Sequence, residues 1–151
     1  GDKTNTPGPE MNLSQFDQTW AQHQMNINAI GPLMLTSALT PLLKARKGKK
    51  NYLRTSGAKE SIVVNLSARV ASMDDNRGPL AWYTYRMSKA ALNAGVRASS
   101  HELKRYGVWT VALYPGMTDT DMSKPFATEK MREKGMVFPV EFSVGRLMDV
   151  V

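Results

Sequence analysis

The sequence predicts an α/β fold built on a parallel sheet, and three observations support this prediction. The chain has 151 residues, 42% hydrophobic and 22% charged, which is typical of one globular domain spanning residues 1–151. Two short apolar runs, 61–66 and 108–114, are rich in β-branched residues and resemble buried strands. A helical pattern over 82–106 separates them, so that strand, helix and strand form a parallel unit.

The N-terminal part is predicted to be a loop followed by a long, interrupted helix. Residues 1–13 are polar and turn-rich, which favours a loop. Ser14 is the expected N-cap, and apolar residues then recur at helical spacing as far as Leu43. Pro32 lacks the N–H that would bond the carbonyl oxygen of Asn28, so we expect a kink that leaves this oxygen free for another partner.

The central helix is predicted to begin near Trp82 and to stop at Gly107, and it carries Tyr85 and Lys89 four residues apart. Residues at this spacing share a helix face, so the phenol and the ammonium can reach the same small volume. Such a pair is usually an ordinary surface pair. The start of this helix, however, lies at the edge of the sheet where the carboxyl ends of both predicted strands meet. Functional groups gather at this edge in parallel sheets.

Composition excludes several classes of protein. There are no cysteines, which excludes disulfides and thiolate metal sites, and His23 and His101 are far apart in the sequence. No apolar run approaches the roughly 18 to 20 residues that span a bilayer, and the N-terminus lacks the order of a signal peptide. We therefore expect a soluble, cytoplasmic protein without metal or membrane partner, although an organellar location stays open.

The net charge of +7 is concentrated in one stretch. Residues 44–59 hold seven Lys and Arg and no acid, together with Gly and Ser, so we interpret 44–60 as a basic loop. An anionic partner is the alternative. Nucleic-acid binding is not favoured, because neither interleaved aromatic residues nor a recognition motif accompanies the charge.

Four motifs occur in an order that resembles the short-chain dehydrogenase/reductase family, and within it the carbonyl reductases of the C-factor and sniffer type. They are NAIGP at 28–32, IVVNLSARVAS at 62–72, YRMSKAALN at 85–93 and YPGMTDTDM at 114–122. The resemblance implies a Rossmann-type fold with a doubly wound parallel sheet. It also implies NAD(P)-dependent hydride transfer between nicotinamide and a small-molecule carbonyl or alcohol.

The resemblance implies a role for each matching residue. Tyr85 corresponds to the general acid/base, and Lys89 to the lysine that lowers the tyrosine pKa and holds the nicotinamide ribose. Asn28 corresponds to the asparagine whose carbonyl holds a water linked to the lysine, as the kink at Pro32 suggests independently. The segment 118–139 corresponds to the substrate loop. The residues expected to line the nicotinamide are Pro115, Gly116, Thr118 and Thr120.

The serine that polarises the substrate carbonyl cannot be placed uniquely. The family usually has two serines after the strand, and here that register reads Ser67-Ala68. Counting back from Tyr85 by the usual spacing leads to Ser72 instead. Both Ser67 and Ser72 are therefore candidates. If neither reaches the site, the oxyanion loses a donor worth on the order of 3 kcal/mol.

The glycine-rich loop that receives the cofactor pyrophosphate has no counterpart in this sequence, nor does the residue that selects NAD or NADP. We therefore expect the C-terminal half of the family fold, a fragment with little activity alone. The resemblance favours NADP over NAD.

The alternative reading is a non-catalytic remnant that acts as an interaction module, because the two long helices resemble those that pair between subunits of the family. We expect a homo-oligomer through these helices. The substrate itself cannot be inferred, but a set of residues suggests an apolar pocket: Trp82, Tyr83, Met117, Met122, Phe126 and Met131.

Overall fold

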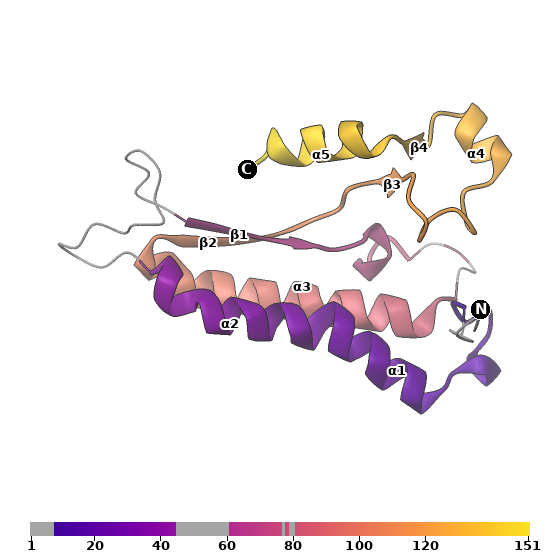
Figure 1. Cartoon of the computed structure of the whole chain (residues 1–151). Helices are drawn as coiled ribbons and strands as arrows, with labels where there is room; N and C mark the ends of the chain where they lie inside the picture. Colours follow the sequence, from indigo (N-terminus) through magenta and orange to yellow (C-terminus); the bar gives the residue numbers. More distant parts are fainter. Residues whose placement is uncertain (1–7, 45–60, 77, 79–80) are drawn as a thin grey trace, which may run out of the picture.

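The computed structural model describes residues 8–44, 61–76, 78 and 81–151. Strand β1 (Ser61–Leu66), helix α3 (Tyr83–Leu103) and strand β2 (Val108–Leu113) form the centre of the molecule (Figure 1). The strands pair in parallel, in a register that runs from Ser61 opposite Val108 to Leu66 opposite Leu113. The predicted strand–helix–strand unit is confirmed, and Gly107 ends the helical region with a left-handed backbone.

The N-terminal helical region is divided into four pieces. A 3₁₀ turn (Leu13–Gln15) precedes helix α1 (Gln18–Met25), which continues through a π-helical segment (Asn26–Ile30) into helix α2 (Gly31–Leu43). The structure therefore confirms an interruption near the predicted start of the helix.

The prediction that Ser14 is the N-cap was wrong. The side chain of Asp17 accepts a hydrogen bond from the main-chain N of Trp20 at 2.7 Å and so caps α1. The Ser14 hydroxyl instead donates to the side chain of Asn12 at 2.6 Å. A carboxylate is the better acceptor for free N–H groups at a helix start, because it also interacts favourably with the helix dipole.

The π-helical segment lies next to Pro32, where the sequence predicts a kink. At its end the N–H of Gly31 donates to the carbonyl oxygen of Asn26, five residues earlier. A π-helical turn contains one residue more than an α-helical turn. This wider turn accommodates Pro32, which has no N–H to donate. The segment also places Asn28 opposite α3, as the contacts of its side chain show below.

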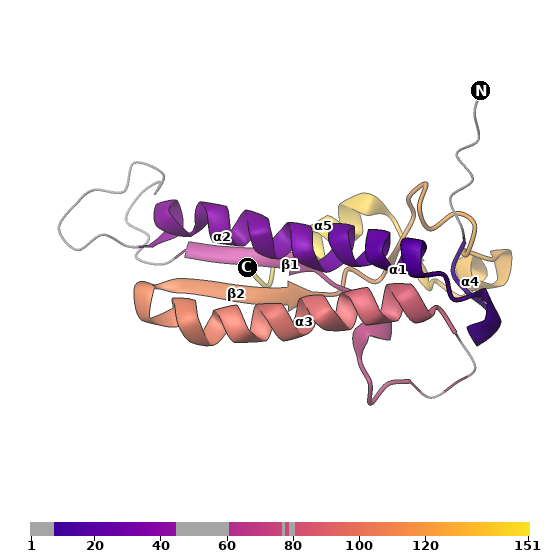
Figure 2. The same ribbon diagram turned by 90° about the horizontal axis from the view of Figure 1, so that it is seen from below.

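Both long helical regions cover the same face of the two-stranded sheet. Figures 1 and 2 show α2 and α3 side by side against β1 and β2. The centre of this layer is a cluster of buried residues, Ala29, Leu92 and Val96. A Cβ atom added to Gly95 of α3 would lie 2.4 Å from a methyl carbon of Leu33, so the two helices approach most closely where α3 has no side chain.

Helix α5 (Val140–Met148) lies on the opposite side of the sheet from α2 and α3 (Figures 1 and 2). Ile62, Val64 and Leu66, which alternate along β1, are between 37% and 53% exposed. This sheet face is therefore much less covered than the face against α2 and α3.

The segment 118–139 contains little regular structure. Strand β3 (Met117–Thr118) and strand β4 (Val137–Phe138) form a short parallel pair, with helix α4 (Glu129–Glu133) between them. Asp119 and Arg132 form a two-bond ion pair, with N–O distances of 2.8 and 3.0 Å, which connects α4 to the residue after β3. The segment 118–139 is thus anchored at both its beginning and its middle.

Some predictions fall partly or wholly outside the described residues. Most of the 44–60 basic loop lies outside them, as do residues 1–7 of the predicted N-terminal loop. In the described part of the chain, no helix combines the length and apolar character needed to cross a membrane. The same part contains no group of three or more potential metal-binding side chains.

Candidate active site

A large pocket of about 860 Å³ lies at the carboxyl ends of β1 and β2. Residues from both ends of the chain line it, including Pro9, Trp20 and Leu147. Most of the residues that the sequence singles out contribute to this large pocket: Asn28, Ser67, Tyr85, Pro115, Gly116, Thr118 and Thr120. The predicted convergence at this edge of the sheet is therefore found in the structure.

Glu10 holds the start of the helix that carries Tyr85. Its main-chain oxygen accepts from the N–H of Trp82 at 2.8 Å, and its carboxylate accepts from the N–H of Thr84 at 3.3 Å. Glu10 is only 3% exposed, and its other carboxylate oxygen has no hydrogen-bond partner. The sequence alone does not reveal this cap, because it comes from residues more than seventy positions away.

Trp82 precedes α3 with a left-handed backbone, at φ 50° and ψ 46°. This conformation costs a residue other than glycine roughly 1–2 kcal/mol, so the surrounding structure must favour it. Glu10 supplies the compensating bonds at this position. Trp82 then places Tyr85 one turn into the helix, inside the large pocket.

The pKa of Tyr85 shifts in the direction opposite to the one that the resemblance implies. Burial raises the pKa of Tyr85 above its ordinary 10.0, and the neighbouring Tyr114 adds to the shift. Lys89 does not lower it, because the Lys89 ammonium donates to the carbonyl oxygen of Leu66 at 2.8 Å. Burial also lowers the pKa of Lys89 below its ordinary 10.5. The expectation that Lys89 shifts Tyr85 toward phenolate is therefore wrong for this state of the site.

A partly buried hydrogen-bond chain joins the π-helical segment to the main chain of Tyr85. The side-chain amide of Asn28 donates to the hydroxyl of Ser88 at 3.1 Å and to the side chain of Gln24 at 2.9 Å. The Ser88 hydroxyl in turn donates to the main-chain oxygen of Tyr85 at 2.8 Å. Ser88 is completely buried. Sequence reasoning missed both Ser88 and Gln24, although Ser88 precedes Lys89 directly.

The two candidate serines occupy different surroundings. Ser67 lines the large pocket and is buried, and its hydroxyl donates to the side chain of Asn93 at 2.6 Å. Ser72 is exposed, does not line the pocket, and accepts a bond from the N–H of Asp75 at 3.3 Å. Ala68 lines the pocket where the family usually has its second serine. The structure brings Ser67 together with Tyr85 and leaves Ser72 outside.

The predicted nicotinamide side of the pocket is tied to the C-terminal elements. The hydroxyl of Thr118 donates to that of Ser143 in α5 at 2.9 Å. The hydroxyl of Ser123 donates to the main-chain oxygen of Thr118 at 2.6 Å and accepts from the N–H of Thr120 at 3.0 Å. These bonds fix the two threonines relative to the strand end.

The walls of the large pocket are mainly apolar. Of the residues expected to form an apolar pocket, Trp82, Met117, Met122 and Phe126 line it, whereas Tyr83 and Met131 do not. Among its described lining residues, Arg69 is the only one with a formal charge at neutral pH. The Arg69 guanidinium is paired with the carboxylate of Asp75.

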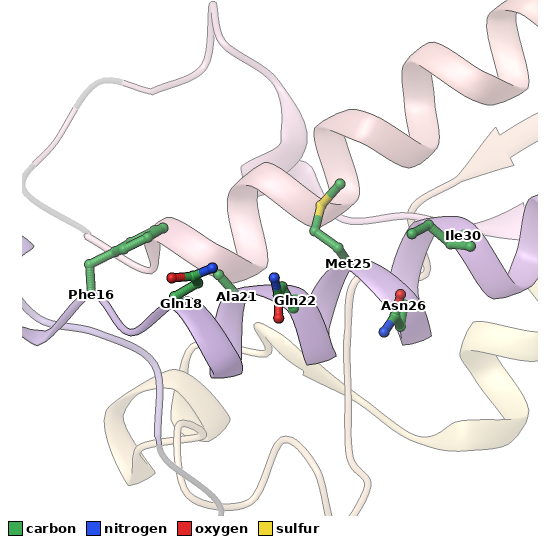
Figure 3. A pocket seen from close by; sticks show the side chains of 7 residues that line it. All are labelled: Phe16, Gln18, Ala21, Gln22, Met25, Asn26 and Ile30. Atoms are coloured by element: carbon green, nitrogen blue, oxygen red, sulfur yellow. The ribbon is translucent and has the colours of Figure 1, made fainter.

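A second pocket, of about 410 Å³, runs along α1 and the π-helical segment (Figure 3). Its lining residues are Phe16, Gln18, Ala21, Gln22, Met25, Asn26 and Ile30. None of these side chains is an acid, a base or a nucleophile. This second pocket therefore offers no side chain suited to proton transfer.

Comparison with known proteins identifies the family. The model of the short chain dehydrogenase family matches residues 3–131, and the chain belongs to this family. The chain is 40% identical over 116 residues to C-signal of Myxococcus xanthus, with 77% of this chain and 62% of that protein covered. It is 36% identical over 117 residues to 1-hydroxy-2-glutathionyl-2-methyl-3-butene dehydrogenase of Rhodococcus sp. (strain AD45), covering 78% of this chain and 45% of that protein.

Solved structures of the same family support the partial Rossmann-type fold. Carbonyl reductase Sniffer of D. melanogaster superposes with a TM-score of 0.74 at 26% identity, over 95% of this chain and 53% of that one. NADPH-bound carbonyl reductase from chicken fatty liver superposes with a TM-score of 0.70 at 27% identity, over 91% of this chain and 49% of that one. The chain thus spans roughly half to two thirds of the length of these relatives.

Proposed function

We propose that the chain carries the proton-transfer site of an NAD(P)-dependent oxidoreductase that interconverts a carbonyl compound and an alcohol. The observation that supports this most strongly is the position of Tyr85, which is partly buried and lines the large pocket beside the carboxyl ends of β1 and β2. Relatives named as dehydrogenase and carbonyl reductase agree with this reaction class.

The direction of the pKa shift favours reduction. A phenol with the ordinary pKa of 10.0 is already protonated at neutral pH, and burial raises the pKa of Tyr85 further. A protonated phenol is the form that donates to a carbonyl oxygen when the carbonyl carbon gains a hydride. Oxidation of an alcohol requires the phenolate, which this environment disfavours.

A nicotinamide dinucleotide, with NADP preferred, supplies or accepts the hydride when it is bound. The residues proposed to hold the nicotinamide are Pro115, Gly116, Thr118 and Thr120, which line the same pocket as Tyr85. Hydroxyl and main-chain donors of this kind suit a neutral carboxamide. The NADPH-bound chicken carbonyl reductase among the similar structures favours NADP.

The remaining residues prepare the proton donor. Lys89 shares a face of α3 with Tyr85 and is the candidate to hold the ribose, and its ammonium must release the carbonyl oxygen of Leu66 to act in this way. Asn28, through Ser88, fixes the backbone turn that carries Tyr85. Ser67 is the candidate donor to the substrate oxygen, and it must release Asn93 to act in this way.

The proposed function is tested by carbonyl reduction with Tyr85→Phe. We expect weak binding of the dinucleotide, so the assay uses NADPH at millimolar concentration and follows its oxidation in the presence of a ketone. Removing the hydroxyl is expected to lower the rate by about 100-fold or more, because general acid catalysis contributes at least this much.

Tyr83→Phe is the matched control, because Tyr83 lies on the same helix turn outside the large pocket. Its rate is expected to stay within about twofold of wild type, since the change does not touch the site. Equal rates in Tyr85→Phe and wild type contradict the proposal. Equal losses in the two variants contradict it as well.

An interaction module is the second candidate function, and one observation favours it. The outer face of α2 exposes Leu35, Leu39 and Leu42, which recur at helical spacing. Exposed apolar stripes of this kind mark interaction surfaces. We propose that this face pairs with a second copy of the chain, with or without catalysis.

A further inference from the structure

The side chain of Trp82 is not needed to cap α3, although Trp82 occupies the N-cap position. A residue at this position usually supplies a side-chain oxygen that accepts a hydrogen bond from an N–H of the first helical turn. Trp82 has no such acceptor, and the carboxylate of Glu10 receives the N–H of Thr84 instead. The indole of Trp82 is therefore available for another purpose, and it lines the large pocket.

The indole of Trp82 links the proton donor to the substrate-loop region. Its ring lies edge-on to the ring of Tyr85, with centroids 6.2 Å apart and planes at 71°. It also contacts Phe126, with centroids 5.1 Å apart and planes at 58°. The three rings make a continuous aromatic wall from α3 to the turn that follows Thr120.

The backbone fixes this wall in place. The N–H of Trp82 donates to the main-chain oxygen of Glu10 at 2.8 Å, and the N–H of Phe126 donates to the oxygen of Ser123 at 2.9 Å. The left-handed backbone of Trp82 further restricts where its ring can lie. A rigid, flat apolar surface beside Tyr85 favours a substrate group that is itself flat, because offset and edge-on aromatic pairs are favourable.

The charges of the large pocket limit the substrate further. Arg69 is the only lining residue with a formal charge among the described residues, and Asp75 already pairs with it. A carboxylate on the substrate would have to compete with Asp75 for the guanidinium. The pocket therefore favours a neutral molecule.

We propose that Trp82 is a specificity-determining residue that selects neutral carbonyl compounds with an aromatic ring next to the carbonyl group. This inference rests on the proposed function of Tyr85. In this arrangement the ring of the substrate lies against the indole, and its carbonyl oxygen faces the phenol of Tyr85.

The test compares acetophenone with cyclohexyl methyl ketone, which have the same number of heavy atoms but differ in aromaticity. Their dissociation constants are measured by saturation-transfer NMR, and kcat and KM by NADPH oxidation. The proteins are wild type, Trp82→Leu and Trp82→Phe. Trp109→Phe is the control, because Trp109 lies on β2 outside the large pocket.

Wild type is expected to prefer acetophenone, and Trp82→Leu to lose roughly three- to tenfold of this preference, which corresponds to one aromatic pair. The loss should lie in KM, with kcat little changed. Trp82→Phe keeps a ring and should retain most of the preference. Trp109→Phe should match wild type. Phenylglyoxylate, the anionic analogue, should bind more weakly than acetophenone.

An unchanged ketone preference in Trp82→Leu overturns the inference, as does failure of both ketones to bind wild type. The NMR arm does not depend on turnover. If wild type shows the Trp82-dependent binding preference but no reduction, the proposed function fails while the binding inference stands. If Tyr85→Phe abolishes reduction and Trp82→Leu leaves the preference intact, the proposed function stands while the binding inference fails.

Discussion

Tyr85 and Lys89 share a face of α3, and burial shifts the pKa of each toward its neutral form. The sequence predicts the pair, because its spacing and the neighbouring motif are local properties of the chain. It does not predict the pKa directions, which depend on how deeply the rest of the fold buries each group. Nor does the sequence predict the partner of Lys89, because its ammonium bonds the carbonyl oxygen of Leu66 on a different element.

Tyr85→Phe is expected to change the pH dependence of stability. The folded-state pKa of Tyr85 lies above 10.0, so its contribution is fully present below pH 10 and is lost as the pH rises through the folded value. The contribution of Lys89 has the opposite sign, since it is lost as the pH falls below 10.5, but both proteins share it.

Urea unfolding at several pH values between about 8 and 11 measures this difference. The free energy of unfolding of wild type should fall relative to Tyr85→Phe above about pH 10. A constant difference over this range would show that the phenol titrates alike in the folded and unfolded protein.

Ser88→Ala is expected to destabilise the fold by about 1–2 kcal/mol, because it removes the buried acceptor of the Asn28 amide. Ser100→Ala is the control, since the Ser100 hydroxyl also donates to the carbonyl oxygen three residues earlier but is more exposed. It should cost less than about 0.5 kcal/mol. Chemical denaturation of both variants checks the prediction, and equal losses would contradict it.

At the scale of elements, the sequence predicts the helices and strands better than it predicts their ends. The boundaries of β1 and α3 follow from hydrophobic period and from Gly107, which are strong local signals. The start of α1 was misplaced because Ser14 and Asp17 are both good caps, and the carboxylate of Asp17 is the better acceptor at a helix start. Pro32 predicts an irregular helix, but it does not predict that the irregularity takes the form of a π-helical turn.

The close approach of α2 and α3 leads to a prediction about glycine. Gly95→Ala would place a methyl group 2.4 Å from Leu33 and should destabilise by about 1–2 kcal/mol, because overpacking outweighs the gain in helix propensity. Gly145→Ala in α5 meets no atom within 4 Å and should stabilise by about 0.5–1 kcal/mol. Thermal unfolding of both variants measures whether their stabilities change in opposite directions. Stabilisation by Gly95→Ala would contradict the close packing of α2 against α3.

At the scale of the molecule, the site depends on segments distant in sequence. Pro9, the π-helical segment, α3 and the residues after β2 all line one pocket, and Glu10 caps the helix that carries Tyr85. The sequence predicts that the strand ends converge there, because parallel topology requires it. The cap by Glu10 and the aromatic contact between Trp82 and Phe126 require the folded chain, since no local pattern specifies them.

The exposed face of α2 is predicted to support self-association. Sedimentation velocity should show a dimer or larger species, and Leu35→Glu should shift it toward monomer by at least tenfold in dissociation constant, because a charge replaces a 61% exposed apolar side chain at the contact. Ser37→Glu, elsewhere on the same helix, is the control and should associate like wild type. A monomeric wild type would contradict pairing through α2.

Transfer of deuterium to a ketone from NADPH that carries deuterium at both C4 positions of the nicotinamide tests the central claim most directly. Mass spectrometry of the product alcohol is predicted to show deuterium on the carbinol carbon with wild type, and about 100-fold less labelled product with Tyr85→Phe. An alcohol without deuterium, or equal labelled product from both proteins, would contradict a hydride-transfer site with Tyr85 as its proton donor.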